Sequence, residues 1–195
     1  WPSTIIGMLE GSTAVTLQAN QDITVTDAIN VTSGGAALTL QAGKSIDINA
    51  SITTNNGALT LSANDTSATN TGITAGTASI NTTGATITTG TGSLSATVAT
   101  SGYHTSGNIT LAAISTTGTV TLNTPGNASV VNAVALDLGA STVGGNLTAT
   151  ATTGNMIDSG VLAITGTSAF TTSANNATIT LDTTTNTFTG AVTIT

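Results

Sequence analysis

Residues 37–57 read ALTLQAGKSIDINASITTNNG, and the residues that follow, ALTLSAN, begin the same phrase again. One phrase earlier, residues 14–20 read AVTLQAN. Self-similarity with a period of about 20 to 50 residues is the signature of a repeat architecture, in which one unit cannot bury its apolar face alone and neighbouring units stack. The repetition therefore decides how the rest of the chain is interpreted.

The phrase contains three segments in which apolar and polar residues alternate: LTLQA, SIDINA and SITT. Alternation of this kind gives a strand one dry face and one wet face. Thr39, Asp47 and Asn49 are then expected to face water. The residues expected to point inward occupy equivalent positions in two successive repeats: Leu38, Leu40, Ile46, Ile48 and Ile52, and one repeat earlier Val15, Leu17, Ile23, Val25 and Ile29. This pattern predicts an all-β parallel β-helix, a β-solenoid with about three strands per coil of 21–27 residues.

Glycines punctuate the chain and precede an alternating strand each time: Gly35, Gly57, Gly92, Gly118, Gly145, Gly166 and Gly190. Their successive intervals are 22, 35, 26, 27, 21 and 24 residues. The interval of 35 leaves two possibilities, one coil with a long insertion or parts of two coils, and the pattern does not fix the register of residues 58–92. A β-sandwich is the structural rival, because it also has short strands and frequent turns, but it does not require the same phrase at every coil.

The domain organisation follows from the same repeats. We expect one β-solenoid domain over residues 1–195, with irregular or inserted coils within 58–118. Both ends look unfinished: the last residues, AVTIT, resemble the start of a further coil, and no helix or polar cap follows them. Since an open end of a solenoid presents unpaired backbone groups, the chain is expected to be a segment of a longer repeat protein or to meet other subunits at its ends.

The composition of the chain excludes some classes of partner and of site. Only 5% of the residues are charged and the net charge is −7, with Lys44 as the single basic residue. Such a chain cannot neutralise a row of phosphates, so we expect no nucleic-acid partner. The chain has no cysteine, which rules out a disulfide scaffold and a thiolate metal site.

Few residues are suited to catalysis. His104 is the single histidine and stands beside Tyr103 in the segment ATSGYHTSGN. No second catalytic group is near in sequence, so we expect this pair to form a surface contact loop, since binding residues are frequent on loops of rigid scaffolds.

The acidic residues are dispersed along the chain, which argues against a polysaccharide-acting enzyme and against a calcium site. The coil offset places Asp22 and Asp65 next to Lys44 and predicts a small exposed ion-pair column. We therefore expect no catalytic residues, no metal and no cofactor.

The phrases GALTLSAN, GNLTATATTGNMIDSGVLAITGTSAF and FTGAVTI resemble the filamentous haemagglutinin-like exoproteins of two-partner secretion, over roughly residues 14 to 195. The resemblance implies a right-handed helix, location outside the cell on a bacterial surface, and export through an outer-membrane two-partner secretion transporter. It further implies adhesion to host cells, glycans or neighbouring bacteria. The family's secretion motif is not found here, which is typical of a shaft segment. The alternative function is a filament subunit that associates end to end, and a polysaccharide-acting enzyme comes third.

Overall fold

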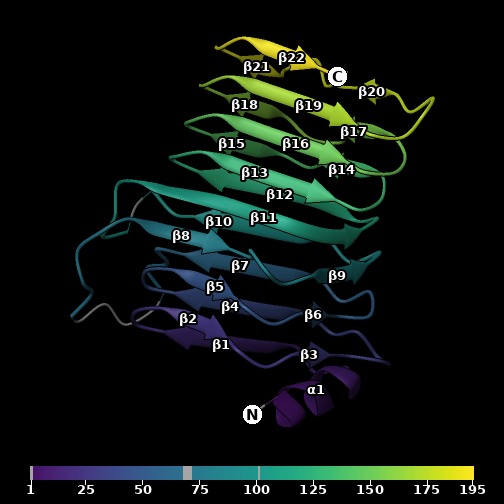
Figure 1. Ribbon diagram of the computed structural model, residues 1–195. Coiled ribbons are helices and arrows are strands. Elements are labelled where there is room, and N and C mark those ends of the chain that lie inside the picture. Colours follow the sequence, from purple (N-terminus) through teal and green to yellow (C-terminus); the bar gives the residue numbers. More distant parts are fainter. Residues whose placement is uncertain (1, 68–71, 101) are drawn as a thin grey trace.

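The computed structural model describes residues 2–67, 72–100 and 102–195, and it shows about eight coils stacked along one axis (Figure 1). Each coil contributes strands to two facing sheets, and neighbouring strands within each sheet are parallel. The front sheet in Figure 1 runs left to right and the rear sheet right to left while the chain climbs, so the coil is right-handed. The predicted right-handed parallel β-helix is confirmed.

The first three coils place one long strand in the first sheet and two short strands in the second. Val15 pairs with Leu38, and Leu38 with Leu59, so the repeated phrases stack in the predicted register. The strands of these coils are β1 (Val15–Ala19), β2 (Ile23–Val25), β3 (Ile29–Asn30), β4 (Leu38–Ala42), β5 (Ile46–Ile48), β6 (Ile52–Thr53), β7 (Leu59–Ala63), β8 (Ala78–Asn81) and β9 (Ile87–Gly90).

The next two coils have one long strand in each sheet: β10 (Leu94–Val98), β11 (Gly107–Thr116), β12 (Thr119–Thr124) and β13 (Ala128–Asn132). Strand β11 is the longest and pairs with both β8 and β9 below it. Its register against β13 shifts between Leu111 and Ile114, where a bulge absorbs the extra length. The three-strand coil is therefore not universal in this solenoid.

The last three coils reverse the division, with two short strands in the first sheet and one strand in the second. Strands β14 and β15 both pair with β12, and β16 pairs with β13. The strands are β14 (Leu136–Leu138), β15 (Ser141–Val143), β16 (Leu147–Ala151), β17 (Met156–Asp158), β18 (Leu162–Ile164), β19 (Ser168–Thr172), β20 (Ile179–Thr180), β21 (Thr187–Phe188) and β22 (Val192–Ile194).

The reversal corrects the single glycine series expected from the sequence. A Cβ at Gly118 would lie 2.4 Å from the Gly92 oxygen, whereas one at Gly145 would lie 2.8 Å from the Gly126 carbonyl carbon. Gly145 therefore stacks on Gly126 and not on Gly118, and Leu147 pairs with Ala128, 19 residues earlier. The glycines form two columns on different edges: Gly35, Gly57, Gly92 and Gly118 on the first, and Gly107, Gly126, Gly145, Gly166 and Gly190 on the second.

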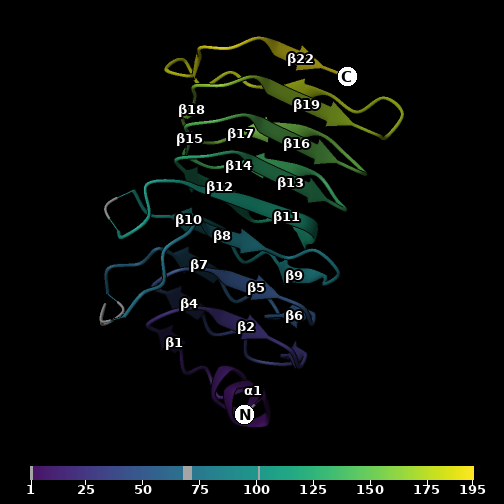
Figure 2. The ribbon, with the colours of Figure 1, turned by 60° about the vertical axis from the view of Figure 1, so that its left-hand side comes forward.

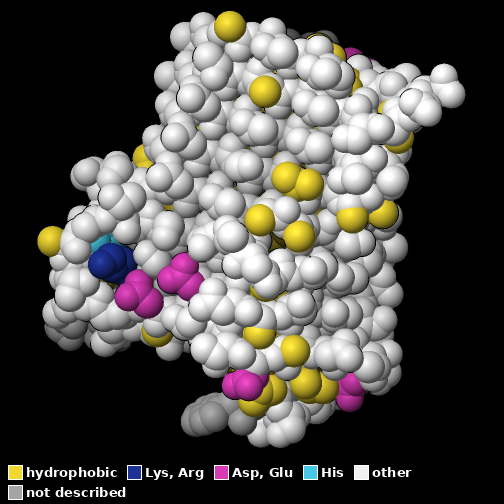
Figure 3. All heavy atoms as spheres, viewed as in Figure 1, with side chains coloured by type: hydrophobic (Ala, Val, Ile, Leu, Met, Phe, Trp, Pro, Cys, Tyr) yellow, Lys and Arg dark blue, Asp and Glu magenta, His cyan; other side chains and the backbone are white. Residues whose placement is uncertain are grey.

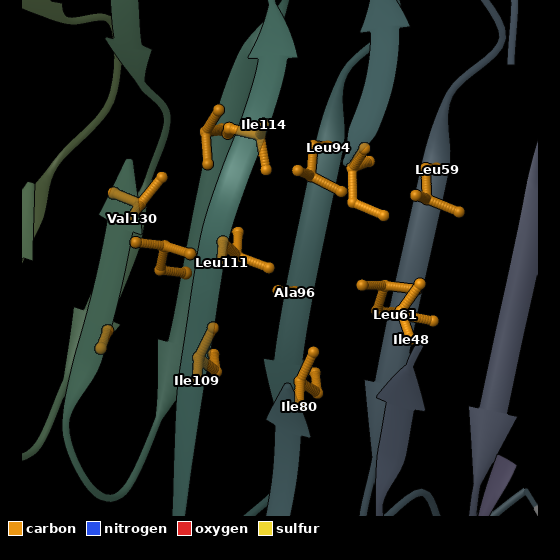
Figure 4. Close-up of a cluster of buried hydrophobic side chains, with 14 of the residues drawn as sticks. Ile48, Leu59, Leu61, Ile80, Leu94, Ala96, Ile109, Leu111, Ile114 and Val130 are labelled. Carbon is orange, nitrogen blue, oxygen red and sulfur yellow. The ribbon is translucent and has the colours of Figure 1, made fainter. Parts of the chain in front are cut away.

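The core is a continuous apolar column between the two sheets. Leu38, Leu40 and Ile46 have no exposed surface, and Ile48 and Ile52 are equally buried, as predicted. Figure 4 shows the same arrangement higher in the stack, where aliphatic side chains of the two sheets meet. In the first coil Leu17 and Ile23 are only half-buried, since the described residues place no further coil beneath them. Burial therefore depends on stacking and not on the single coil.

The two end coils differ from each other. Helix α1 (Pro2–Glu10) lies against the first coil, with Leu9 fully buried and its carbonyl accepting a hydrogen bond from Ala36 N at 3.3 Å. Proline at the first helical position and apolar residues at Ile5, Ile6 and Leu9 explain this helix. The expectation that both ends are uncapped is therefore wrong for this end. At the other end, β22 closes the eighth coil and leaves Val192 and Ile194 exposed by 44% and 62%.

Candidate functional site

Two segments interrupt the regular coils at the same edge of the stack. One connects β7 to β8, between Ala63 and Ala78, and the other connects β10 to β11, between Val98 and Gly107. Both project at the left in Figures 1 and 2. We call their described residues, 64–67, 72–77, 99–100 and 102–106, the lobe. Because Leu59 pairs with Leu94, the interval of 35 residues is one coil with an insertion, which resolves the two alternatives left by the sequence.

Asn64 holds the two segments together. Asn64 is 1% exposed, and its backbone adopts the left-handed conformation, with φ of 54°. Its amide nitrogen donates to the carbonyls of Ala99 at 2.6 Å and His104 at 2.7 Å, and its amide oxygen accepts from His104 N at 3.0 Å. Asparagine tolerates this conformation better than most residues. One side chain from the first segment therefore fixes the path of the second.

His104 is buried, which corrects the expectation of a surface histidine. It is 5% exposed, and its Nδ1 lies 2.7 Å from the Gly76 carbonyl oxygen, the geometry of a protonated Nδ1 donating to that carbonyl. Its Nε2 is enclosed and has no hydrogen-bond partner among the described residues. His104 therefore joins the second segment to the first, and its side chain is not offered to a partner on the surface.

Tyr103 is the part of the predicted contact loop that does reach the surface, with 61% of it exposed. It borders a shallow depression of about 320 Å³ whose lining comes from both segments. The lining residues are Ile73, Thr74, Ala75, Gly76, Tyr103, His104, Thr105 and Ser106. Tyrosine presents a large, rigid contact surface with a polar tip, which suits it to an interface.

Polar side chains of the regular coils support the lobe from below. Lys44 Nζ donates to Thr74 Oγ1 at 3.1 Å and lies 3.5 Å from the Ala75 oxygen. Gln21 Oε1 accepts from Thr74 N at 3.2 Å. Figure 3 shows the single lysine and the single histidine close together on this projection, with carboxylates beside them. The lobe contains the only His and Tyr of the chain, and the only Lys supports it.

The predicted ion-pair column is replaced by hydrogen bonds. Asp22 Oδ1 accepts from the backbone nitrogen of Ser45 at 3.0 Å, and Asp65 Oδ1 accepts from Ser67 N at 2.7 Å. Lys44 turns instead toward the insertion, whose position could not be predicted from the repeat pattern. Sequence reasoning missed Gln21 and Asn64 as supporting residues, and it placed Lys44 in an ion-pair column instead of against the insertion. Their signal is positional, since all three follow a strand of the repeated phrase at one edge.

Metal binding finds no support in the described part of the chain, where no group of three or more His, Cys, Asp or Glu side chains converges. The most buried carboxylate, Asp158, is 6% exposed and accepts from Asp182 N at 2.9 Å and from the Asn186 amide at 2.6 Å. These bonds tie the seventh coil to the eighth. Among the described residues, no helix is long and apolar enough to span a membrane.

Comparison with known proteins gives one partial match. A family model described as repeats of unknown function (DUF5649) matches residues 125–195, about a third of the chain, which spans β13 to β22. No curated protein and no solved structure matches the chain. The match agrees with the repeat architecture of the upper coils and does not extend to the lobe.

Proposed function

We propose that this chain is a shaft segment of an extracellular adhesive protein on a bacterial surface, acting by display and contact and not by catalysis. The observation that carries the proposal is a rigid, regular solenoid from which one lobe projects sideways with Tyr103 exposed at it. A stiff stack positions such a loop for contact, since recognition residues are commonly found on loops held by a rigid scaffold. The resemblance to two-partner secretion exoproteins supports export through an outer-membrane transporter.

The surface suits this role. Outward positions are mostly Thr, Ser and Asn, and the chain contains only one basic residue, so nonspecific attraction to anionic membranes or nucleic acid is weak. Contact through the lobe would then rest on one aromatic anchor and the polar rim around it, the arrangement found at small protein interfaces.

The test is an adhesion assay in which the intact chain is presented on beads to host cells, immobilised glycans and neighbouring bacteria. Tyr103→Ala is expected to reduce retention at least about tenfold, as expected for loss of an interface anchor. Ile157→Ala is the matched control, because Ile157 is an exposed apolar side chain, 44% exposed, on β17 away from the lobe. Retention on none of the three surfaces, or equal retention of the two variants, would overturn the proposal.

A second candidate is a filament subunit that associates end to end. It is favoured by the exposed Val192 and Ile194 of the last coil and by an apolar groove of about 270 Å³ between α1 and the first coil, lined by Ile5, Leu17 and Ile23 among others. Sedimentation at rising concentration tests it. Growth into long species that Ile194→Asp abolishes would support the filament, and a monomer at every concentration would exclude it.

A further inference from the structure

A second feature, on the opposite edge from the first glycine column, is not used by the lobe. The short phrase Gly-Asn-x-Thr or Gly-Asn-x-Ser occurs three times, at residues 107–110, 126–129 and 145–148. In the structure these phrases begin or precede β11, β13 and β16, which are neighbours in the second sheet. The three asparagines therefore stand one above another.

Each asparagine side chain is held in the same orientation. Asn108 Oδ1 accepts from Asn127 N at 2.8 Å, Asn127 Oδ1 accepts from Asn146 N at 2.8 Å, and Asn146 Oδ1 accepts from Thr167 N at 2.9 Å. The preceding glycines make this possible, because a Cβ at Gly126, Gly145 or Gly166 would lie 2.5, 2.3 or 2.3 Å from the asparagine oxygen of the coil below. Glycine and asparagine therefore act as a pair in each phrase.

These bonds use the amide oxygens and leave the amide nitrogens available. All three asparagines are exposed, and within the described residues their Nδ2 atoms have no acceptor. Two residues further along each strand, hydroxyl groups form a parallel column of Thr110, Ser129 and Thr148. The two columns line a shallow groove of about 370 Å³. Each coil thus holds one set of hydrogen-bond donors in place, and successive sets are about 4.8 Å apart along the axis.

The surroundings define the chemistry that this groove accepts. None of the described residues that line it is charged, and Figure 3 shows no charged group on the front face over β11, β13 and β16. An anionic ligand would find no positive charge there and a net charge of −7 around it. The lining also lacks an aromatic anchor, which a protein partner would ordinarily need. The ligand class that fits the groove is therefore neutral and rich in hydroxyl groups, with repeating units that follow one another along the solenoid axis.

We propose that the columns Asn108–Asn127–Asn146 and Thr110–Ser129–Thr148 bind a neutral linear polysaccharide along the solenoid axis, with about one sugar unit facing each coil. The amide nitrogens donate to sugar oxygens, and the protein hydroxyls both donate and accept. Because the asparagines are already fixed by the stack, binding does not have to order them. The inference deepens the adhesive function proposed above, on which its biological meaning rests, but its site is separate from the lobe.

The experiment is an NMR titration of the isotope-labelled chain with cellohexaose, laminarihexaose and mannohexaose, and with hexagalacturonic acid as the charged comparison. At least one neutral hexasaccharide is expected to shift the side-chain amide signals of the three asparagines, and the acidic one is not. Asn127→Asp keeps an oxygen that accepts from Asn146 N but removes the donor, so it is expected to weaken binding at least about tenfold. Asn155→Asp is the matched control, because Asn155 Oδ1 accepts from Thr178 N at 3.0 Å in the same way outside the groove.

Two results would overturn the inference: no asparagine signal moves with any neutral hexasaccharide, or Asn127→Asp binds as well as Asn155→Asp. Neither result affects adhesion through the lobe, which the Tyr103→Ala comparison measures separately. Conversely, a chain that binds a hexasaccharide at these asparagines but adheres to no surface would refute the proposed adhesive function and leave the groove assignment in place.

Discussion

The first edge of the lower coils, from β1 to β10, and the second edge of the upper coils, from β12 to β22, show two kinds of corner. Each kind also occurs in the other half: Thr124 Oγ1 donates to the Gly107 oxygen at 2.6 Å, and Asn56 Oδ1 accepts from Thr91 N at 2.9 Å. In the lower coils a buried threonine closes the first edge, with Thr54 Oγ1 donating to the Gly57 oxygen at 2.5 Å and Thr89 Oγ1 to the Gly92 oxygen at 2.8 Å. In the upper coils exposed asparagines close the second edge from outside, as Asn127 and Asn146 do. The core column continues through both, so the apolar register fixes the stack while the chemistry of the corners is interchangeable.

Substitutions in the core are expected to destabilise both halves most, and by similar amounts. Leu61 in the third coil and Leu147 in the sixth are 0% and 1% exposed. Replacing either with alanine is expected to cost about 2 to 5 kcal/mol of unfolding free energy, because each leaves a cavity between the sheets. Ile194→Ala in the exposed last coil should change it by less than about 0.5 kcal/mol. Urea unfolding followed by circular dichroism measures all three. A large difference between Leu61→Ala and Leu147→Ala would show that the two halves are not equivalent in their cores.

The two glycine columns are expected to be equally intolerant of a side chain. A Cβ at Gly92 would lie 2.3 Å from the Gly57 oxygen, and one at Gly145 would lie 2.8 Å from the Gly126 carbon and 2.3 Å from Asn127 Oδ1. Alanine at either position is expected to lower the free energy of unfolding by about 3 kcal/mol, because backbone of the next coil must move. Gly7→Ala in α1 meets nothing within 4 Å and should stabilise by about 1 kcal/mol or less. Similar thermal midpoints for Gly92→Ala and Gly7→Ala would contradict the expectation that a side chain at Gly92 clashes with the neighbouring coil.

Buried and exposed corner side chains are expected to differ in what they contribute to stability. Thr89 is fully buried, and Thr89→Ala removes one of the two hydroxyl donors to the Gly92 oxygen, since Thr116 Oγ1 at 3.0 Å remains, and also leaves a small cavity; a cost of about 1 to 2 kcal/mol is expected. Asn146 is exposed, and Asn146→Ala exposes Thr167 N to water, so a cost of about 0.5 to 1 kcal/mol is expected. Hydrogen exchange of Thr167 N and of the amide of Gly92 reports each corner locally. Equal losses would mean that the two kinds of corner are not distinguished by burial.

The smallest effect concerns the helical cover of the first coil. Glu10 Oε1 accepts from Thr32 N at 2.9 Å and Thr32 Oγ1 at 2.7 Å, and these hydrogen bonds lower the pKa of Glu10 below its ordinary value of 4.5. Since the pKa is lower in the folded state, this stabilisation is present above pH 4.5 and is lost as the pH falls through the folded value. The difference in thermal midpoint between the wild type and Glu10→Gln should therefore be small at neutral pH and vanish in acid. A difference that grows on acidification would contradict the assignment.

Much of the fold could be predicted from the sequence, because in a β-solenoid the core residues occupy every second position of each strand and recur at equivalent positions in each coil. The register of Val15, Leu38 and Leu59 follows from that alone. The switch of glycine column between Gly118 and Gly126 could not be foreseen, since both columns use the same residue before a similar strand and differ only in which sheet that strand joins. Helix α1 was missed because it is short and lies outside the repeats.

The site was predicted in part. Tyr103 is exposed on a projecting loop as expected, whereas His104 is buried because Asn64 and Gly76, which are far from it in sequence, enclose it. Sequence reasoning located the loop but could not show which of two adjacent side chains faces outward, since that depends on a contact with another coil. The hydrogen bonds of Lys44 to Thr74 and Ala75 were hidden for the same reason.

The insertion between Ala63 and Ala78 has a consequence for protein engineering. Strands β7 and β8 keep their pairing with the coils on either side although the connection between them is longer than in the coil below. The entropy of closing a loop rises only slowly with its length. This edge is therefore a natural graft point: a foreign peptide inserted between Ser67 and Gly72 would be held at a fixed height on the shaft, while Asn64, Thr74 and Gly76 keep their contacts with the neighbouring segments.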